Sequence, residues 1–401
     1  MPEASDPRVA HLPMKRTCPF SPPPEYRRLR EETPVTKVEL PSGEAWAVTR
    51  HENVRQMLTD PAFSADRRNP AFPALGTARP GADGFTPSLA GMDPPEHGPA
   101  RRAVLGEFTV KRMNALRPRI QQIVDECIDR MLAGPKPVDL VKALSLPVPS
   151  LVICELIGVP YSDHDFFQSR STTLLSRNPD PQERKTAVDE LRSYLHGLVT
   201  QKEADPTDDL LGRQVLKQHE TGTKDHDGLV ALAFLLLAAG HETTANMISL
   251  STVAMLEHPE QHARITSDPG KTPDAVEELL RYFTIAETVT SRVAVDDTEI
   301  DGVTIRAGEG VLGLTYAANR DPRAFENPDA FDVERGGRHH LAFGFGAHQC
   351  LGQNLARMEL QIVIDTLVAR IPGLRLGAPV EDLAFKDDAI VYGLYELPVA
   401  W

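Results

Sequence analysis

One glycine-rich loop that contains a single cysteine constrains the fold of this chain more than any other stretch. Residues 343–352 read Phe-Gly-Phe-Gly-Ala-His-Gln-Cys-Leu-Gly, so Cys350 stands among glycines. Gly344 and Gly346 can adopt positive φ at no steric cost, which lets the backbone fold around the sulfur and direct N–H groups at it. Apolar residues at helical spacing follow, and the positive end of a helix dipole favours a thiolate. These apolar residues are Leu351, Leu355, Met358 and Ile362.

This decamer resembles the haem-binding loop of the cytochrome P-450 family, Phe-Gly-x-Gly-x-His/Arg-x-Cys-x-Gly, at every fixed position. In that family the cysteine ligates the haem iron and pushes electron density toward it. The resemblance implies that Cys350 is the metal ligand of a b-type haem and that His348 helps to bind the cofactor. The competing interpretation is a buried free cysteine in a glycine-rich turn.

Composition and charge exclude several other classes of protein. The chain has 401 residues and a formal net charge of −14, which argues against nucleic acid as a partner. Its four cysteines are too few and too scattered for a disulfide scaffold or a zinc cluster, and they fit a reducing cytoplasm. We expect one domain over residues 1–401, with residues 1–34 as an irregular lead-in, because no low-complexity linker separates the motifs.

The apolar runs predict a protein that does not insert into a membrane. The first residues show no signal-peptide pattern, and the longest uncharged apolar run covers residues 229–239. That run is roughly half of the ~20 residues needed to span a bilayer, so it predicts a core helix. We therefore expect a soluble, cytoplasmic protein.

Periodicity and turn signals predict a mainly helical chain with a few strands. The expected elements are a hairpin of residues 35–40 and 46–49, a helix over 51–58, a long helix over 229–250 and beyond that Asp225 or Asp227 caps, a helix over 273–281, and strands over 289–295 and 304–305 joined by a turn at 301–302. Cys127 and Cys154 lie in apolar helical segments and are expected in the core.

A helix start with a His-x-x-x-Arg pair follows the sequence Asp-Pro-Pro-Glu. Asp93 can cap this helix, and His97 and Arg101 stand four residues apart on one face. The family uses such a pair to hold a haem propionate, and the resemblance implies this role here. The alternative is a surface pair. Pro99 fits a helix only near its start, so it leaves open whether His97 belongs to the regular turns.

The centre of the long helix breaks local rules. Gly240 is unfavourable in mid-helix by about 1 kcal/mol, and the polar Glu242 and Thr243 stand among apolar residues. The segment resembles the family's oxygen-binding groove, which implies proton delivery by Glu242 and Thr243. Without the resemblance, a kinked core helix explains the pattern equally well. The resemblance also places Leu235, Ala238, Ala239 and Val289 in an apolar substrate pocket.

A Glu-x-x-Arg motif closes the helix over 273–281. Glu278 and Arg281 are three residues apart, a spacing that more often makes a solvated ion pair. In the family this pair is buried and joined by a second arginine, a place that Arg335 fills here. Arg292 similarly matches a strand arginine that pairs with a propionate. Ordinary surface charge remains the alternative for each.

The stretch from Pro61 to Gly91 shows no period and occupies the place of a loop that roofs the family's substrate pocket. Its arginines, Arg67, Arg68 and Arg79, are expected to be solvated rather than to bind substrate.

The resemblance covers nearly the whole chain and implies the cytochrome P-450 fold, mainly α with a small β-rich part. It implies a haem-thiolate monooxygenase that hydroxylates or epoxidises a medium-sized, mostly apolar small molecule with O2. A separate ferredoxin and ferredoxin reductase are expected to supply electrons, and Arg102, Lys111 and Arg112 are candidates for the docking site. Two alternatives remain, a peroxide-using peroxygenase and a non-catalytic haem carrier or sensor.

Overall fold

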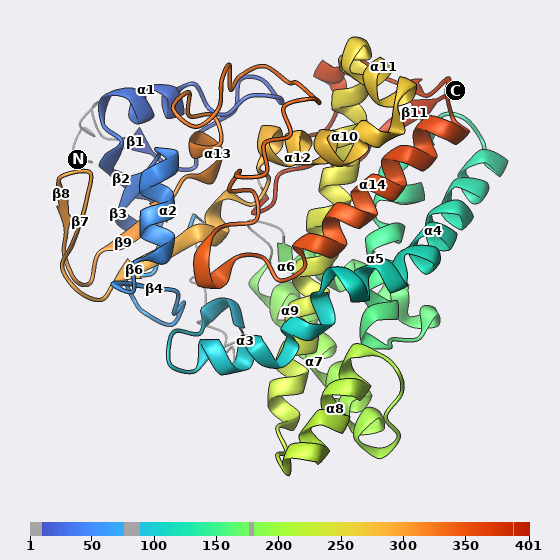
Figure 1. Cartoon of the computed structure of the whole chain (residues 1–401), viewed down its shortest axis with the longest axis horizontal. Coiled ribbons are helices and arrows are strands. Elements are labelled where there is room, and N and C mark those ends of the chain that lie inside the picture. The colour runs from blue at the N-terminus through green and yellow to red at the C-terminus, as the bar shows by residue number, and fades with distance from the viewer. Residues whose placement is uncertain (1–9, 76–88, 176–179, 388) are drawn as a thin grey trace. The chain divides into compact units, whose positions relative to one another are not determined.

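The structure is a computed structural model of the chain that describes all residues except 1–9, 76–88, 176–179 and 388 (Figure 1). The chain divides into two compact units. The first comprises Met1–His97, Leu280–Phe331 and Gly337–Cys350, and the second comprises Gly98–Leu279, Asp332–Gly336 and Leu351–Trp401. Each unit is described separately below. Arg79 lies outside the described residues.

The first unit contains the main sheet. Its elements are β1 (Ala10–His11), α1 (Glu25–Glu32), β2 (Val35–Leu40), β3 (Gly43–Val48), α2 (His51–Thr59), β4 (Phe63–Ser64), η1 (Leu89–Gly91), η6 (Glu287–Thr290), β6 (Ser291–Ala294), β7 (Thr298–Ile300), β8 (Val303–Ile305), β9 (Gly310–Gly313), α13 (Thr315–Ala318) and η7 (Gly346–His348). Six strands pair in the order β1-β2-β3-β9-β6-β4, and β7 and β8 form a separate hairpin. Val48, Val54, Met57 and Val311 are buried in the core between α2 and this sheet.

The second unit is helical. Its elements are η2 (Gly106–Phe108), α4 (Val110–Ala133), β5 (Val138–Asp139), the π-helix η3 (Val141–Ser145), α5 (Pro147–Ile157), η4 (Tyr161–Asp163), α6 (His164–Leu175), α7 (Pro181–Ala204), α8 (Leu210–Thr221), α9 (His226–Gly240), α10 (Glu242–Glu257), α11 (Pro259–Ser267), η5 (Pro269–Lys271), α14 (Gln353–Arg370), β10 (Arg375–Leu376), η8 (Val380–Asp382) and β11 (Pro398–Ala400). Helix α14 packs along α4 and α10 (Figure 1). Helices α3 (His97–Leu105) and α12 (Thr272–Phe283) contain residues of both units.

Side-chain caps explain where several helices begin. Asp180 accepts hydrogen bonds from the backbone N–H groups of Gln182 and Glu183, at 2.9 and 3.0 Å, at the start of α7. Asp225 accepts one from Gly228 at 2.8 Å at the start of α9, which settles the choice between Asp225 and Asp227. Each cap satisfies backbone donors that have no partner within the first turn.

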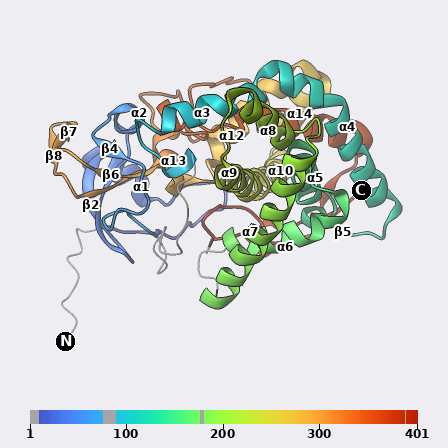
Figure 2. The ribbon, with the colours of Figure 1, turned by 90° about the horizontal axis from the view of Figure 1, so that it is seen from below.

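Four sequence predictions need correction. Residues 25–32 of the expected irregular lead-in form α1. The long helix is interrupted at His241, so α9 and α10 are separate elements that follow each other along one line (Figures 1 and 2). Asp301 and Gly302, with φ of 50° and 76°, join β7 to β8 rather than a strand over 289–295 to one over 304–305. The first residues of that expected strand form η6 instead.

Other predictions are confirmed. The hairpin of residues 35–40 and 46–49 is β2 and β3, although β3 begins at Gly43, and the helix over 51–58 is α2. Cys127 and Cys154 are buried, and burial raises the pKa of the Cys154 thiol to about 12.

Among the described residues one stretch, His226–Glu257, is long and apolar enough to cross a membrane by length and composition. Most of its apolar window, 61%, is buried within the chain. Leu229, Ala233 and Leu237 are each at most 4% exposed. The apolar run over 229–239 is therefore a core helix, as its length predicts.

Candidate functional site

The loop that carries Cys350 is closed by its own backbone. The Cys350 N–H donates to the Phe343 carbonyl at 2.8 Å, and the Gly344 N–H donates to the Leu341 carbonyl at 2.9 Å. Gly344 and Gly346 have φ of 68° and 72°, the left-handed region in which glycine carries no steric penalty. Cys350 is exposed, in contrast to the buried Cys127 and Cys154. The expected turn thus forms and leaves the thiol accessible to a ligand.

Helix α2 packs against the part of this loop that contains Phe345 and Gly346. A Cβ atom on Gly346 would lie 2.7 Å from the Leu58 carbonyl oxygen, so the loop and the end of α2 approach closely at a position where only glycine fits. The Arg55 guanidinium lies 4.2 Å from the centre of the Phe345 ring. Both contacts fix the loop against a helix that packs on the main sheet.

Two predicted site histidines come together in the first unit. The rings of His97 and His348 stack with their centres 4.1 Å apart and their planes inclined by 27°. His97 is the first residue of α3, and Pro99 is accommodated in the first turn, so the proline does not displace the histidine. Asp93 does not cap α3 through its side chain, because that carboxylate accepts hydrogen bonds from Ser64 and the Ala65 N–H.

Arg292 is a buried cation on β6. It is 6% exposed and donates to the Ser291 carbonyl at 2.7 Å. Burial, with a smaller contribution from the charge of Arg67 and an opposing one from Asp93, lowers the pKa of Arg292 to about 10. A buried guanidinium in this state is short of negative charge, which a carboxylate such as a haem propionate supplies.

The other loop arginines differ from one another. Arg68 is exposed and pairs with Asp66, with its Nε atom at 2.9 and 3.1 Å from the two carboxylate oxygens. The side chain of Arg67 is accessible, yet burial lowers its pKa. Arg68 is therefore solvated, as the sequence predicts. Arg67 keeps part of its side chain accessible to solvent, but protein atoms surround its guanidinium closely enough to lower its pKa.

The residues of the first unit fit a haem. An accessible cysteine lies in a loop that glycines shape, and His348 of the same loop stacks on His97. Arg292 is a buried cation that an anionic ligand would stabilise. Arg101, the remaining predicted propionate ligand, belongs to the second unit and stands on α3 one turn after His97, so it is not counted in the donor set of the first unit. This donor set matches a thiolate ligand with cationic and N–H donors for two propionates.

The junction of α9 and α10 contains the predicted proton-delivery residues. The hydroxyl of Thr243 donates to the Ala239 carbonyl at 2.8 Å, and Glu242 is the first residue of α10 and only 4% exposed. A Cβ on Gly240 would lie 3.0 Å from Ile153 on α5, so this glycine permits close helix packing. Ala239 is exposed and Leu235 half-buried, which leaves an accessible apolar surface on α9.

Sequence reasoning missed the partners of Glu242. Lys386 lies 144 residues further along the chain and donates to Glu242 Oε1, and it also donates to Asn246 Oδ1 at 3.1 Å. Nothing in the local sequence around Lys386, which stands between an aromatic residue and two aspartates, indicates that it is buried.

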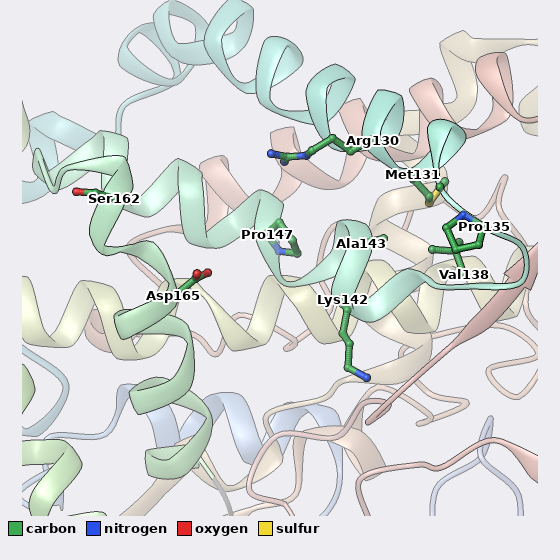
Figure 3. Close-up of a pocket in the computed structure, with 10 residues that line it drawn as sticks. Arg130, Met131, Pro135, Val138, Lys142, Ala143, Pro147, Ser162 and Asp165 are labelled. Carbon is green, nitrogen blue, oxygen red and sulfur yellow. The ribbon is translucent and has the colours of Figure 1, made fainter.

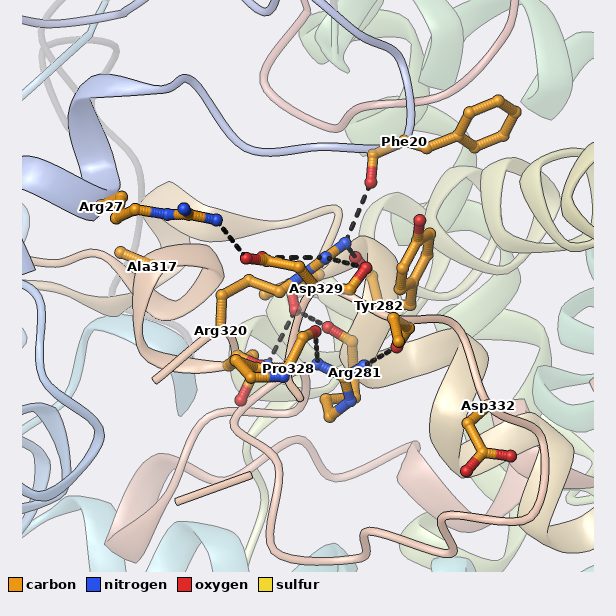
Figure 4. A network of polar contacts seen from close by, with 12 residues as sticks. Phe20, Arg27, Arg281, Tyr282, Ala317, Arg320, Pro328, Asp329 and Asp332 are labelled. Carbon is orange, nitrogen blue, oxygen red and sulfur yellow. Dashed lines mark hydrogen bonds and ion pairs between the residues drawn. The ribbon is translucent and has the colours of Figure 1, made fainter. Parts of the chain in front are cut away.

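Both residues of the Glu-x-x-Arg motif are fully buried. Glu278 is fully buried and lies 3.2 Å from Arg335 Nε, and it accepts the Asp332 N–H at 3.0 Å. Arg281 donates to three backbone carbonyls, those of Asn319 and Pro328 at 2.8 Å and of Ala330 at 3.2 Å (Figure 4).

A further ion pair, between a buried glutamate and a half-buried arginine, was not predicted. Glu277 accepts two hydrogen bonds from Arg357, at 2.6 and 3.0 Å, and so links α12 to α14. This bidentate geometry is the strongest arrangement for an arginine and a carboxylate.

A cavity of about 560 Å³ lies in the second unit beside α4 and η3 (Figure 3). Its lining includes Arg130, Lys142, Pro147 and Asp165 and none of the predicted site residues. Val289 lies elsewhere, in η6 of the first unit, and is 48% exposed. The cavity is therefore not the substrate pocket that the sequence predicts.

Known proteins resemble this chain along nearly its whole length. The profile of the Cytochrome P450 family matches residues 272–371. Pentalenic acid synthase of Streptomyces avermitilis is 50% identical over 97% of each chain, and Vitamin D3 dihydroxylase of Streptomyces griseolus is 47% identical over 97% of this chain and 96% of its own. The crystal structure of cytochrome P450 MoxA from Nonomuraea recticatena superimposes with a TM-score of 0.92 and 60% identity, and 98% of each chain is covered. The chain therefore belongs to the cytochrome P450 family, as a haem-thiolate monooxygenase that acts on small molecules with O2.

Proposed function

We propose that the protein hydroxylates a medium-sized, mostly apolar small molecule with electrons from a separate ferredoxin and its reductase. The observation that carries this proposal is the accessible Cys350 in a glycine-formed loop, together with the stacked His97 and His348 rings. Relatives named for pentalenic acid and for vitamin D3 support a substrate with a large hydrocarbon surface.

We assign the cofactor contacts as follows. Cys350 ligates the iron, and His97, Arg101, Arg292 and His348 hold the two propionates. The haem, when bound, supplies the activation of O2 that inserts one oxygen atom into the substrate. A propionate would give the buried charge of Arg292 an anionic partner, which the salt bridges of the described residues do not provide.

Proton delivery is the task we assign to Glu242 and Thr243. The Glu242 carboxyl group can take up a proton at Oε2 and release it, since Oε1 is engaged by Lys386. The Thr243 hydroxyl, which donates to the Ala239 carbonyl at 2.8 Å, can turn from that oxygen to pass a proton onward.

Apolar side chains define the proposed substrate surface. Leu235 and Ala238 are half-buried on α9, and Ala239 is exposed. Val289 in the first unit is also accessible. An apolar lining of this kind selects a substrate by shape. We further propose that the chain acts as one domain in the cytoplasm.

The surface around the end of α3 is the proposed ferredoxin site. Arg102, Lys111 and Arg112 are exposed, and the apolar Leu105 and Val110 between them are 47% and 62% exposed. Positive charge around an apolar centre suits an acidic electron-transfer protein despite the net charge of −14.

Two experiments test the proposal. In the first, the reduced, haem-loaded protein is exposed to carbon monoxide. We expect the red-shifted absorbance band of thiolate ligation in the parent protein and its loss in Cys350→His. A band without the red shift in the folded, haem-loaded parent protein contradicts the assignment. A compound panel screened by the haem spectral shift identifies a ligand. Turnover of that ligand with NAD(P)H, ferredoxin and reductase supports a monooxygenase, turnover with peroxide alone supports a peroxygenase, and binding without turnover supports a carrier or sensor.

A further inference from the structure

A buried polar cluster of the second unit joins the junction of α9 and α10 to the C-terminal segment 384–395. Lys386 and Glu242 form an ion pair whose side chains are 8% and 5% exposed. Asn246, one turn after Glu242 on α10, is 2% exposed and accepts from the same ammonium at 3.1 Å. Removing a lysine and a glutamate from water is unfavourable, and their mutual attraction must offset this cost, so such a buried pair needs an explanation.

Backbone hydrogen bonds and a close approach to α10 position Lys386 within the described residues of segment 384–395. The Lys386 N–H donates to the Gly393 carbonyl at 2.9 Å, and the Tyr395 N–H donates to the Ala384 carbonyl at 2.9 Å. A Cβ on Gly393 would lie 2.1 Å from Asn246 Oδ1, so only glycine lets the segment approach α10 this closely. The Lys386 Nζ atom also lies 5.6 Å from the centre of the Tyr395 ring.

The two carboxylate oxygens of Glu242 have different surroundings, because the ammonium of Lys386 contacts only one of them. Lys386 engages Oε1, whereas Oε2 is buried and has no hydrogen-bond partner among the described residues. The Asn246 Nδ2 atom is also buried without a partner in the described part of the chain. Buried polar atoms in this state bind ordered water, the source from which a carboxylate takes up protons.

We infer that Lys386 is a positioning residue for proton delivery: it anchors Glu242 through Oε1 and thereby makes Oε2 the atom that carries the proton. The inference rests on the proposed role of Glu242. Lys386 itself passes no proton to substrate. Because the lysine belongs to segment 384–395, a ligand or mutation that displaces this segment alters proton delivery at a helix 144 residues away in sequence.

The test compares haem-loaded variants that all retain the red-shifted carbon monoxide band. Lys386→Met removes the ammonium, and Lys386→Arg keeps a cationic donor. Lys202→Met is the matched control, because Lys202 and Asp209 form another ion pair of the second unit with side chains that are 10% exposed. The readouts are product and peroxide formed per NAD(P)H, and the solvent isotope effect on turnover of the ligand found by the spectral screen.

We expect Lys386→Met to lower product per NAD(P)H about tenfold, to raise peroxide release and to increase the solvent isotope effect, since general acid–base groups contribute about a hundredfold or more. Lys386→Arg restores much of the coupling. Lys202→Met loses stability without a change in coupling or isotope effect. In a Glu242→Gln background Lys386→Met has no further effect on coupling, because it acts through the carboxylate.

Two results overturn the inference. In the first, Lys386→Met forms as much product per NAD(P)H as the parent protein. In the second, Lys386→Met lowers product per NAD(P)H as strongly in the Glu242→Gln background as in the parent protein. A parent protein that forms no product from any ligand overturns the proposed function instead. In that case infrared spectroscopy still decides the inference. The carboxyl band assigned through Glu242→Gln shifts in Lys386→Met if the lysine orients Glu242, and an unshifted band refutes it.

Discussion

Replacing Gly346 by alanine is expected to damage the cysteine loop in two separable ways. Alanine at φ 72° is strained by about 1 to 2 kcal/mol. Its Cβ would also lie 2.7 Å from the Leu58 carbonyl oxygen and 3.2 Å from the Thr59 side chain, so the loop or the end of α2 must shift. Overpacking of this kind adds about 1 to 3 kcal/mol, which gives a total of about 2 to 5 kcal/mol.

Two other glycines separate the strain from the collision. Gly344 and Gly302 have φ of 68° and 76°, and a Cβ on either would meet nothing within 4 Å. Gly344→Ala in the same loop and Gly302→Ala in the β7–β8 turn should therefore each cost only about 1 to 2 kcal/mol. The turn is not part of the proposed cofactor contacts, so Gly302→Ala should retain its haem.

The assay is urea unfolding of the haem-loaded proteins, with the haem-to-protein ratio and the carbon monoxide band measured on the same samples. We expect Gly346→Ala to unfold at the lowest urea concentration and to lose the most haem. If Gly346→Ala and Gly344→Ala have the same free energy of unfolding, the close approach to Leu58 contributes nothing and the reasoning is wrong.

Three further changes test other parts of the structure. Glu277→Gln should lower the free energy of unfolding in urea by about 3 kcal/mol, because it leaves Arg357 on α14 without its carboxylate partner. Asp129→Asn removes the partner of Arg370 in a more exposed ion pair of α14, so it should lower that free energy by less than about 1 kcal/mol. Burial raises the pKa of Glu359 far above 4.5, so the folded protein binds more protons than the unfolded chain above that pH. Stability should then fall by up to about 1.4 kcal/mol per pH unit as pH rises, and Glu359→Gln should remove this slope. Lys111→Glu should slow reduction by a ferredoxin at low salt without changing the substrate-induced spectral shift; an unchanged rate excludes it from the docking site.

The sequence predicts features that a few neighbouring residues determine. The cysteine loop depends on glycines that stand beside the cysteine, the β2–β3 hairpin on alternating residues and a turn, and the start of α9 on Asp225. Each is a local preference of the backbone or of one side chain, so it can be recognised without knowledge of the rest of the chain. The family resemblance adds residues from distant segments, and the structure brings two of them, His97 and His348, into contact.

Partners of buried charges cannot be recognised in the same way. Lys386 and Glu277 look like solvated residues in sequence, because lysine and glutamate are rarely buried unless they are paired. Their partners, Glu242 and Arg357, lie 144 and 80 residues away. Whether a charge is buried depends on which distant segment covers it, and local spacing does not contain that information.

Two fully buried arginines of the first unit, Arg281 and Arg320, show why this limit falls on the segment before the cysteine loop. Between α13 and η7 the described chain forms no helix or strand, so the carbonyl groups that its turns leave unpaired need donors from elsewhere. Arg281 donates to carbonyls of this segment, and Arg320 within it donates to those of Phe20 and Tyr282 at 2.9 Å (Figure 4). A guanidinium has five N–H donors in a fixed plane and can serve several carbonyls at once. The irregular segment that leads to Cys350 is thus ordered by side-chain donors in addition to the backbone hydrogen bonds of its turns. A pattern search for helices and strands has nothing to detect there.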